Sequence, residues 1–175
     1  MTQKINKNIK EKCKNIKIVI TDVDGVLTDG SRIYDSHGES LKIFHNHDGM
    51  GINILLRNKI PTVILTKEKS PIVKKWANDM NISGLFWGAK QKEIELEKIK
   101  KKFTVKNSEI AYIGDDVNDI EVLKIVGFSA CPYDANIKTK PYVDYVCQTK
   151  SGKGCFREIS DIIMSEKFPQ KIKWY

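Results

Sequence analysis

The sequence predicts an α/β protein in which a parallel, Rossmann-like β-sheet carries helices on both faces. Apolar runs of strand length alternate with segments whose apolar residues recur at helical spacing. The connections between them are short, which favours strands joined through helices that pack back onto one sheet. Polar and acidic clusters directly follow several of the strand-like runs, as is typical of a fold whose ligand lies beyond the carboxyl ends of parallel strands.

The first elements are a buried strand and a β-hairpin. Residues 16–21 form a continuous run rich in β-branched side chains, as expected for a strand buried on both faces. Residues 31–34 and 41–44 then flank Asp35-Ser36-His37-Gly38, which predicts a hairpin with a longer turn. The next segment, 51–58, has its apolar side chains on one side and is expected to be a helix.

A second buried strand follows and leads into another helix. Pro61 precedes the strand-like residues 62–66. Ser70 and Pro71 then mark a helix start, because serine is a common N-cap and proline is favoured at the first helical position. This helix is expected to end near residue 80.

The rest of the chain continues the alternation. The remaining expected elements are a strand at 85–87, a helix at 90–102, a strand at 110–113, a helix at 117–126, strands at 128–131 and 142–147, and a helix at 156–164. In the helix at 90–102, Ile94, Leu96 and Ile99 are expected to face the core.

A single domain is expected at residues 16–166, between an N-terminal extension at 1–15 and a C-terminal tail at 167–175. The extension is studded with lysine, which favours a frayed, solvated segment over a lipid-binding helix or a signal peptide. No apolar run approaches the ~18 residues of a membrane span. Four scattered cysteines without a CxxC pair are typical of reduced thiols. A cytoplasmic protein without a membrane partner is expected.

The net charge of +8 raises the question of nucleic-acid binding. The cations are nearly all lysine, and the only arginines are Arg32, Arg57 and Arg157. Arginine does most of the bidentate recognition of phosphates and bases, and no aromatic residues are interleaved in the densest lysine cluster, at Lys98, Lys100, Lys101 and Lys102. The composition therefore argues against a nucleic-acid partner and leaves open an attraction for anionic small molecules.

Acidic and polar side chains stand at the ends of three predicted strands. They are Asp22 and Asp24 after the first strand, Thr66 at the end of the second, and Asp115, Asp116 and Asp119 after the strand at 110–113. Lys92 lies near the start of its helix. Because parallel strands end at one edge of a sheet, these side chains are expected to meet there.

Such a set is suited to phosphoryl transfer. Clustered carboxylates repel one another unless a hard cation such as Mg²⁺ lies between them. One aspartate can attack phosphorus and form an aspartyl-phosphate, and a second can protonate the leaving oxygen and then accept a proton from water. A lysine and a hydroxyl can hold the phosphoryl oxygens. An isolated Asp-x-Asp or Gly-Asp-Asp is common in turns, so the order of the whole set carries the prediction.

These residues resemble the haloacid dehalogenase superfamily of phosphatases, and more narrowly the 3-deoxy-D-manno-octulosonate 8-phosphate phosphatase family. The resemblance spans about residues 16–164 and rests on the hairpin and on Asp22-Val23-Asp24-Gly25-Val26-Leu27-Thr28-Asp29-Gly30, Asp48-Gly49-Met50-Gly51-Ile52, Ala111-Tyr112-Ile113-Gly114-Asp115-Asp116 and Ser151-Gly152-Lys153-Gly154-Cys155-Phe156-Arg157-Glu158. It implies a Rossmann-like domain without a cap domain. It also implies a homotetramer assembled through the hairpins, in which a neighbour's tail helps to close each site.

The resemblance also implies a role for each residue. Asp22 would be the nucleophile and Asp24 the general acid and base. Thr66 and Lys92 would bind the phosphoryl group. The Mg²⁺ ligands would be Asp22, the backbone carbonyl of Asp24, and Asp115, with Asp116 and Asp119 holding Lys92 and the waters of the metal. The family's substrate positions fall on His45, Asn46, His47, Asp48, Gly49, Asn53, Glu68, Trp76 and Lys92.

The substrate positions depart from the family's pattern. The octulosonate enzymes carry arginine where this chain has His47, Asn53, Glu68 and Trp76. Glu68 resembles relatives that act on nine-carbon, sialic-acid-type 9-phosphates. The expected function is therefore hydrolysis of a phosphorylated 3-deoxy-2-ulosonic acid, with the nine-carbon substrate preferred over the eight-carbon one. The alternative is a non-catalytic or weakly active oligomerisation module like that attached to some acylneuraminate cytidylyltransferases.

Overall fold

The computed structural model describes residues 7–174, and its centre is a six-stranded parallel sheet. The strand order is β5-β4-β1-β6-β7-β8. The strands are β1 (Ile18–Thr21), β4 (Thr62–Leu65), β5 (Gly84–Phe86), β6 (Ile110–Ile113), β7 (Phe128–Cys131) and β8 (Tyr145–Val146). The chain runs outward from β1 in one direction and then in the other, so β1 lies between β4 and β6 at the switch point of the sheet.

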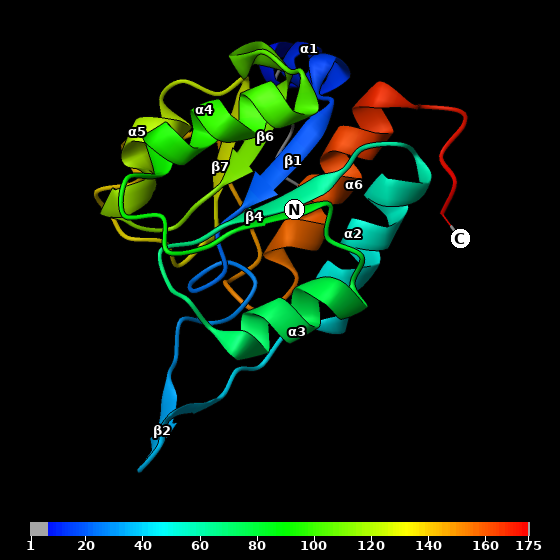
Figure 1. Cartoon of the computed structure of the whole chain (residues 1–175). Coiled ribbons are helices and arrows are strands. Elements are labelled where there is room, and N and C mark those ends of the chain that lie inside the picture. Colours follow the sequence, from blue (N-terminus) through cyan, green and yellow to red (C-terminus); the bar gives the residue numbers. More distant parts are fainter. Residues whose placement is uncertain (1–6, 175) are drawn as a thin grey trace.

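Helices cover both faces of the sheet, as predicted (Figure 1). One face carries α1 (Lys7–Asn15), α2 (Asn46–Arg57), α3 (Pro71–Asp79) and α6 (Cys155–Lys167), and the other carries α4 (Lys92–Phe103) and α5 (Ile120–Leu123). Alternate side chains of β1 enter the two cores: Val19 packs on the first face, and Ile18 and Ile20 on the second. Residues 7–174 contain no cap domain, as predicted.

A β-hairpin projects from this body (Figure 1). It consists of β2 (Ile33–Asp35) and β3 (Gly38–Leu41). Asp35 pairs with Gly38, so the turn is shorter than predicted, because the Asp35 carboxylate accepts a hydrogen bond from the His37 backbone N–H and tightens it. The second strand ends at Leu41 rather than at residue 44.

Several element boundaries differ from the predicted ones. Helix α2 begins at Asn46 instead of residue 51, because the His45 side chain accepts a hydrogen bond from the His47 N–H and caps the helix. The predicted helix 117–126 is a 3₁₀ turn at Val117–Asp119 followed by the short α5. The predicted strand 142–147 is reduced to β8, because Lys140–Tyr142 forms another 3₁₀ turn.

The inward face of α4 also differs from the prediction. Leu96 and Ile99 are buried as predicted, but Ile94 is 50% exposed. The buried stripe is Lys92, Leu96 and Ile99, which follows helical spacing of four and three residues and leaves Ile94 on another side. Because the first residue of this stripe is a lysine, a search for apolar residues at helical spacing did not identify the buried face.

Residues 7–15 form helix α1, so the predicted solvated extension is wrong for this stretch. Ile9 and Cys13 are buried in the core beneath α6. Lys12 pairs with Asp144 and Lys10 with Glu166 at 3.2 Å. The folded unit therefore begins before residue 16. Residues 1–6 lie outside the described part of the chain.

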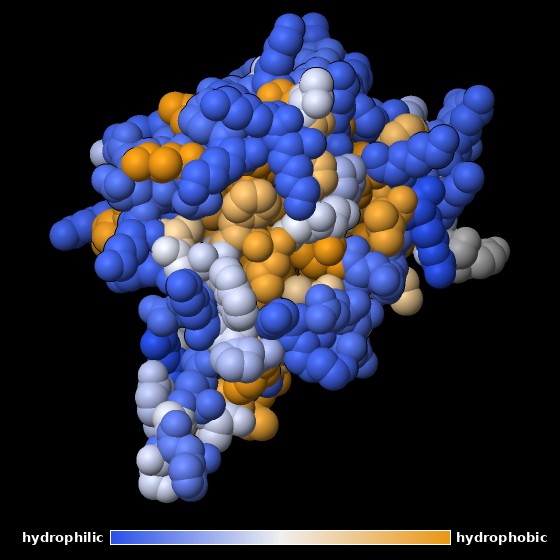
Figure 2. Space-filling view, in the orientation of Figure 1, coloured by the Kyte–Doolittle hydropathy of each residue, from blue (hydrophilic) through white to orange (hydrophobic). Residues whose placement is uncertain are grey.

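The outer surface is largely hydrophilic on the face shown in Figure 2. Hydrophobic side chains gather at the centre of this view, between α3 and α4, where β5 is the edge strand. The hairpin exposes further apolar side chains, among them Ile33, Tyr34, Leu41 and Ile43. Across residues 7–174, no helix combines the length and the apolar character that crossing a membrane requires.

Candidate active site

The predicted residues meet where β1, β4 and β6 end. Asp22 follows β1, Thr66 follows β4, and Asp115 follows β6 after Gly114. Asp22 and Thr66 are buried, and Lys92 reaches the same place from the first residue of α4. Neighbouring parallel strands thus bring together groups that are more than 90 positions apart in the sequence.

A buried ion-pair network lies at the centre of the site. Lys92 Nζ is 2.6 Å from Asp22 Oδ2 and 2.6 Å from Asp119 Oδ1. The Tyr112 hydroxyl donates a hydrogen bond to the same Asp119 oxygen, and Asp119 Oδ2 accepts from the backbone N–H of Asp115. Asp119 therefore holds Lys92 against Asp22. Tyr112 was not predicted, because its position in a buried strand gives no sign of a polar role.

The charges in this network shift one another's pKa values. Burial raises the pKa of Asp22, although the neighbouring Lys92 ammonium opposes the shift. Burial would lower the pKa of Lys92, but the charges of Asp22 and Asp119 outweigh it and raise this pKa. The raised pKa favours the charged form of Lys92, beside the carboxylate predicted to attack phosphorus.

The loop after β1 is shaped to admit the Asp115 carboxylate. Gly25 has φ +85°, and a Cβ built there would lie 2.0 Å from Asp115 Oδ2. Only glycine leaves this space and adopts this backbone conformation without strain. Burial, together with the negative charges of Asp22 and Asp119, raises the pKa of Asp115 to about 8.

These carboxylates fit a divalent cation. One oxygen from each of Asp22, Asp115 and Asp119 lies within 4.8 Å of the others. Both oxygens of Asp119 accept hydrogen bonds, and so do both oxygens of Asp22, from the Val23 N–H and from Lys92, so hydrogen bonding does not separate these two carboxylates as metal ligands. Burial and the charges of Asp22 and Asp119 raise the pKa of Asp115 although the Lys92 charge opposes them, and a divalent cation would offset this accumulated negative charge, since carboxylate oxygens are the ligands that hard divalent ions prefer.

Asp24 is held by the hairpin, which the sequence did not indicate. Its Oδ1 accepts hydrogen bonds from Lys42 Nζ at 2.6 Å and from Thr28 Oγ1 at 3.2 Å. Lys42 has no exposed side-chain area and also pairs with Glu39 at 2.8 Å. Nothing in the local sequence distinguishes Lys42 from the many surface lysines.

A cavity of about 450 Å³ opens beside Asp24 and Asp115. Arg32 from the hairpin lines it, and Arg32 Nη2 lies 3.1 Å from Oε1 of Glu68. Glu68, a predicted substrate residue, is therefore paired with a guanidinium from its own chain. Sequence reasoning missed this role of Arg32, because the pairing joins positions 36 residues apart in the sequence.

The other predicted substrate positions lie apart from this cavity. His45, Asn46, Gly49, Asn53 and Trp76 line a second cavity of about 310 Å³, where Trp76 stacks on Phe44 with ring centroids 4.3 Å apart. The structure thus groups these five positions with one another, but not with the carboxylates.

Two of the predicted acidic residues have framework contacts instead. Asp48 is fully buried, and its Oδ1 accepts from the backbone N–H of Arg157 at the start of α6, so it does not face a cavity. Asp116 caps the 3₁₀ turn at Val117 and accepts from Asn136. Within residues 7–174, Lys92 forms ion pairs with Asp22 and Asp119 and not with Asp116, so Asp119 is the one of the two predicted residues that holds this lysine.

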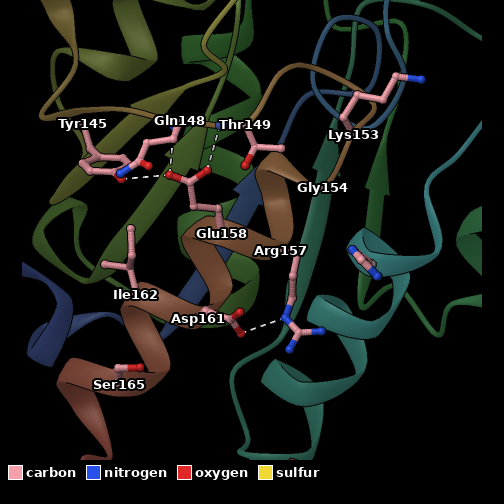
Figure 3. A pocket seen from close by; sticks show the side chains of 11 residues that line it. Tyr145, Gln148, Thr149, Lys153, Gly154, Arg157, Glu158, Asp161, Ile162 and Ser165 are labelled. Carbon is pink, nitrogen blue, oxygen red and sulfur yellow. Dashed lines mark hydrogen bonds and ion pairs between the residues drawn. The ribbon is translucent and has the colours of Figure 1, made fainter. Parts of the chain in front are cut away.

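A pocket of about 500 Å³ lies against α6 and the loop that precedes it (Figure 3). At its centre, Glu158 accepts hydrogen bonds from the Tyr145 hydroxyl and from the backbone N–H groups of Gln148 and Thr149. His47 lines this pocket, but none of Asp22, Lys92 and Asp115 does. The contacts of Glu158 hold the segment that leads into the glycine-rich loop at 151–154. In this loop, the Gly152 N–H donates a hydrogen bond to the Val26 carbonyl beside the site.

Comparisons with known proteins agree with this geometry. Residues 64–159 match the family model for haloacid dehalogenase-like hydrolases. The chain is 43% identical over 156 residues to 3-deoxy-D-manno-octulosonate 8-phosphate phosphatase of Haemophilus influenzae, an alignment that covers 89% of this chain and 87% of that protein. The Escherichia coli K12 phosphatase of the same name is 34% identical, over 91% of this chain and 85% of its own length.

Solved structures show the same fold. The cobalt-bound Haemophilus influenzae phosphatase has a TM-score of 0.87 at 43% identity and covers 89% of this chain and 91% of its own. The Moraxella catarrhalis phosphatase, solved with magnesium ion, phosphate ion and KDO, has a TM-score of 0.89 at 33% identity and covers 93% of this chain and 94% of its own.

Proposed function

The chain belongs to the 3-deoxy-D-manno-octulosonate 8-phosphate phosphatase family of haloacid dehalogenase-like hydrolases, and we propose that it hydrolyses a phosphorylated 3-deoxy-2-ulosonic acid through an aspartyl-phosphate on Asp22. It is a phosphatase with an acidic cluster suited to a divalent metal. One observation carries the proposal: Asp22 is buried, adjoins the charged Lys92, and lies in the same cluster as Asp115.

In the proposed mechanism, a carboxylate oxygen of Asp22 attacks phosphorus. The P–O bond to the sugar breaks, its electron pair stays on the leaving oxygen, and Asp24 supplies the proton that this oxygen takes up. A water molecule then attacks the aspartyl-phosphate and gives a proton to Asp24. Phosphate leaves, and the Asp22 carboxylate is restored.

Two further groups of this chain stabilise the transferring phosphoryl group. Lys92 is held in its charged form by Asp22 and Asp119. It can therefore bind the non-bridging oxygens, whose charge redistributes in the transition state. Thr66 directly follows the neighbouring strand β4 and would offer its hydroxyl to the same oxygens.

We propose Mg²⁺ as the metal, held by the carboxylates of Asp22 and Asp115 and by the backbone carbonyl of Asp24. Magnesium uses few protein carboxylates and keeps room for a phosphate oxygen, which fits a compact cluster of three carboxylates. When bound, the ion would offset the charge of the phosphate and of the clustered aspartates.

The test of this mechanism is Asp22→Asn. The change is nearly isosteric but replaces the nucleophilic carboxylate, so phosphate release should fall by at least about 10³-fold while the thermal unfolding midpoint changes little. Asp79→Asn, which alters an exposed carboxylate paired with Lys75, is the matched control and should keep full activity. Substantial turnover by the Asp22→Asn protein, with sequencing that excludes reversion, would refute the mechanism.

For the substrate, we propose the eight-carbon octulosonate 8-phosphate first and a nine-carbon 9-phosphate as the second candidate. Relatives up to 43% identical are named for the octulosonate, and the Arg32–Glu68 pair keeps a guanidinium beside the cavity. The unusual Glu68 itself favours the nine-carbon acid, since a carboxylate accepts hydrogen bonds from sugar hydroxyls. The ratio of the two kcat/KM values decides, because each factor of ten equals about 1.4 kcal/mol of transition-state binding.

We further propose a homotetramer whose contacts include the hairpin. Ile33, Tyr34 and Leu41 are exposed on the hairpin and Ile43 just after it, and within residues 7–174 the two hairpin strands pair only with each other. Such hairpins are marginal in water unless they pack on a partner. The alternative of a non-catalytic module is disfavoured, because Lys92 pairs with Asp22 in a buried network and Asp115 lies in the same acidic cluster.

A further inference from the structure

Lys42 makes an unusual set of contacts for a lysine next to a projecting hairpin. Its side chain has no exposed area, and its Nζ lies between Asp24 Oδ1 at 2.6 Å and Glu39 Oε1 at 2.8 Å. The second oxygen of Glu39 accepts from Ser70 Oγ at 2.8 Å, at the start of α3. A buried ammonium costs several kcal/mol unless it is paired, so these contacts fix its position.

The two carboxylate oxygens of Asp24 differ in their hydrogen-bond partners. Oδ1 accepts from both Lys42 Nζ and Thr28 Oγ1. Oδ2 is buried and has no hydrogen-bond partner within residues 7–174. Two donors on Oδ1 leave no room there for an acid proton, so a proton on Asp24 is directed to Oδ2.

We propose that Lys42 is a positioning residue that orients Asp24 so that Oδ2 carries the transferred proton. The inference rests on the proposed function, in which Asp24 is the acid and base. In the first step, the Oδ2–H bond breaks, and its proton passes to the oxygen that leaves with the P–O electron pair. In the second step, Oδ2 takes a proton from the attacking water. Lys42 keeps its own protons throughout.

The hairpin thereby acquires a second function besides assembly. Lys42 follows β3 directly, and Glu39 lies within β3, so the element that extends away from the body also holds the proton donor in place. If the ion pairs only fastened the hairpin, their loss would slow every substrate equally. If they orient the acid, the loss depends on how much the leaving group needs a proton.

The experiment compares two substrates that differ in this need. Octulosonate 8-phosphate has an alkoxide leaving group that must be protonated, whereas 4-nitrophenyl phosphate releases a stable phenolate. We expect Lys42→Met to lower kcat/KM about 30-fold or more for the sugar phosphate and about threefold or less for the aryl phosphate. Each kcat/KM value is measured at the pH optimum of that variant, so that a change in the protonation state of Asp24 does not affect the comparison.

Two further variants control for folding and for fastening. Lys42→Arg keeps a donor to Oδ1 and should restore most of the wild-type ratio between the substrates, which a lost structural contact would not require. Ser70→Ala loosens Glu39 but leaves the contact between Lys42 and Asp24, and should keep the wild-type ratio. If Lys42→Met fails to fold, the test rests on Lys42→Arg alone. The proposal is then overturned if Lys42→Arg shifts the ratio of the two kcat/KM values, sugar phosphate to aryl phosphate, as far as Asp24→Asn does.

The outcomes separate this inference from the function beneath it. If Asp24→Asn loses activity equally on both substrates, Asp24 is not the proton donor and the proposed mechanism fails. If Asp24→Asn discriminates between the substrates but Lys42→Met slows both equally, only the role of Lys42 is overturned.

Discussion

Asp48 is a buried carboxylate that acts in the framework of the protein. Its Oδ1 accepts a hydrogen bond from the Arg157 N–H in the first turn of α6, where unpaired N–H groups favour a negative charge. Burial nevertheless raises the pKa of Asp48 to about 6. Its other oxygen has no hydrogen-bond partner within residues 7–174, which is consistent with a group that takes up a proton readily.

The shifted pKa predicts a pH dependence of stability. The native pKa of about 6 exceeds the ordinary value of 3.8, so the native state binds the proton more tightly than the unfolded chain. The resulting stability is present below about pH 4 and is lost as the pH rises through 6, by up to about 3 kcal/mol.

The Asp48→Asn variant tests this prediction, since asparagine keeps the acceptor for Arg157 and cannot ionise. Urea unfolding between pH 4 and 7 should show a shallower fall in the free energy of unfolding than in the wild type. Asp161→Asn, at a partly exposed carboxylate in α6, should leave the wild-type slope. Equal slopes for Asp48→Asn and wild type would mean that Asp48 titrates normally.

At the scale of elements, the loop after β1 requires a glycine at position 25. Gly25→Ala should abolish activity, because its Cβ would occupy the place of the Asp115 carboxylate and the residue must keep φ +85°. We expect turnover to fall at least about 100-fold, together with weaker Mg²⁺ binding measured by calorimetry.

Gly38→Ala is the matched control for this prediction. Gly38 also has positive φ, at +122°, but a Cβ there meets nothing within 4 Å. Its replacement should cost about 1–3 kcal/mol of strain in the hairpin turn and leave the turnover of the folded enzyme within a few-fold of wild type. Similar activity losses in both variants would show that backbone strain, and not the contact with Asp115, limits Gly25.

Helix α1 is expected to be an integral part of the fold. Ile9→Ala removes a side chain that is only 4% exposed in the core beneath α6 and should lower the free energy of unfolding by about 2–4 kcal/mol. Lys10→Ala removes only a surface ion pair with Glu166 and should cost under about 1 kcal/mol. If chemical denaturation shows equally small losses in the free energy of unfolding for both variants, α1 does not contribute to the stability of the fold.

At the scale of the whole molecule, the hairpin is predicted to hold the oligomer together. Leu41→Asp places a charge on an apolar side chain that is 49% exposed, and it should convert the tetramer to smaller species in light scattering at micromolar concentration. His37→Asp, at the exposed turn of the same hairpin, should leave the tetramer intact. A wild-type protein that is itself a stable monomer would refute the assembly.

The sequence by itself determined the fold class and the place of the site. Runs of β-branched residues mark β1, β4 and β6 because strands buried on both faces have no polar face to break the pattern. Asp22 and Thr66 follow their strands directly and Asp115 follows β6 after Gly114, so parallel topology alone brings them to one edge. Lys92 joined this set because it lies near the start of the predicted helix at 90–102, and the resemblance then implied its role in binding the phosphoryl group.

Only the tertiary structure decided which of these groups touch. Two ion pairs, Lys42 with Asp24 and Arg32 with Glu68, join the hairpin region to the body of the protein. The sequence separations within these pairs match neither helical nor strand spacing, so no pattern predicts them. The burial of Asp48 against α6 likewise depends on how two helices pack. Secondary-structure patterns record which face of an element is apolar, whereas the partner of a buried charge is set by packing between elements, which no local window of the sequence contains.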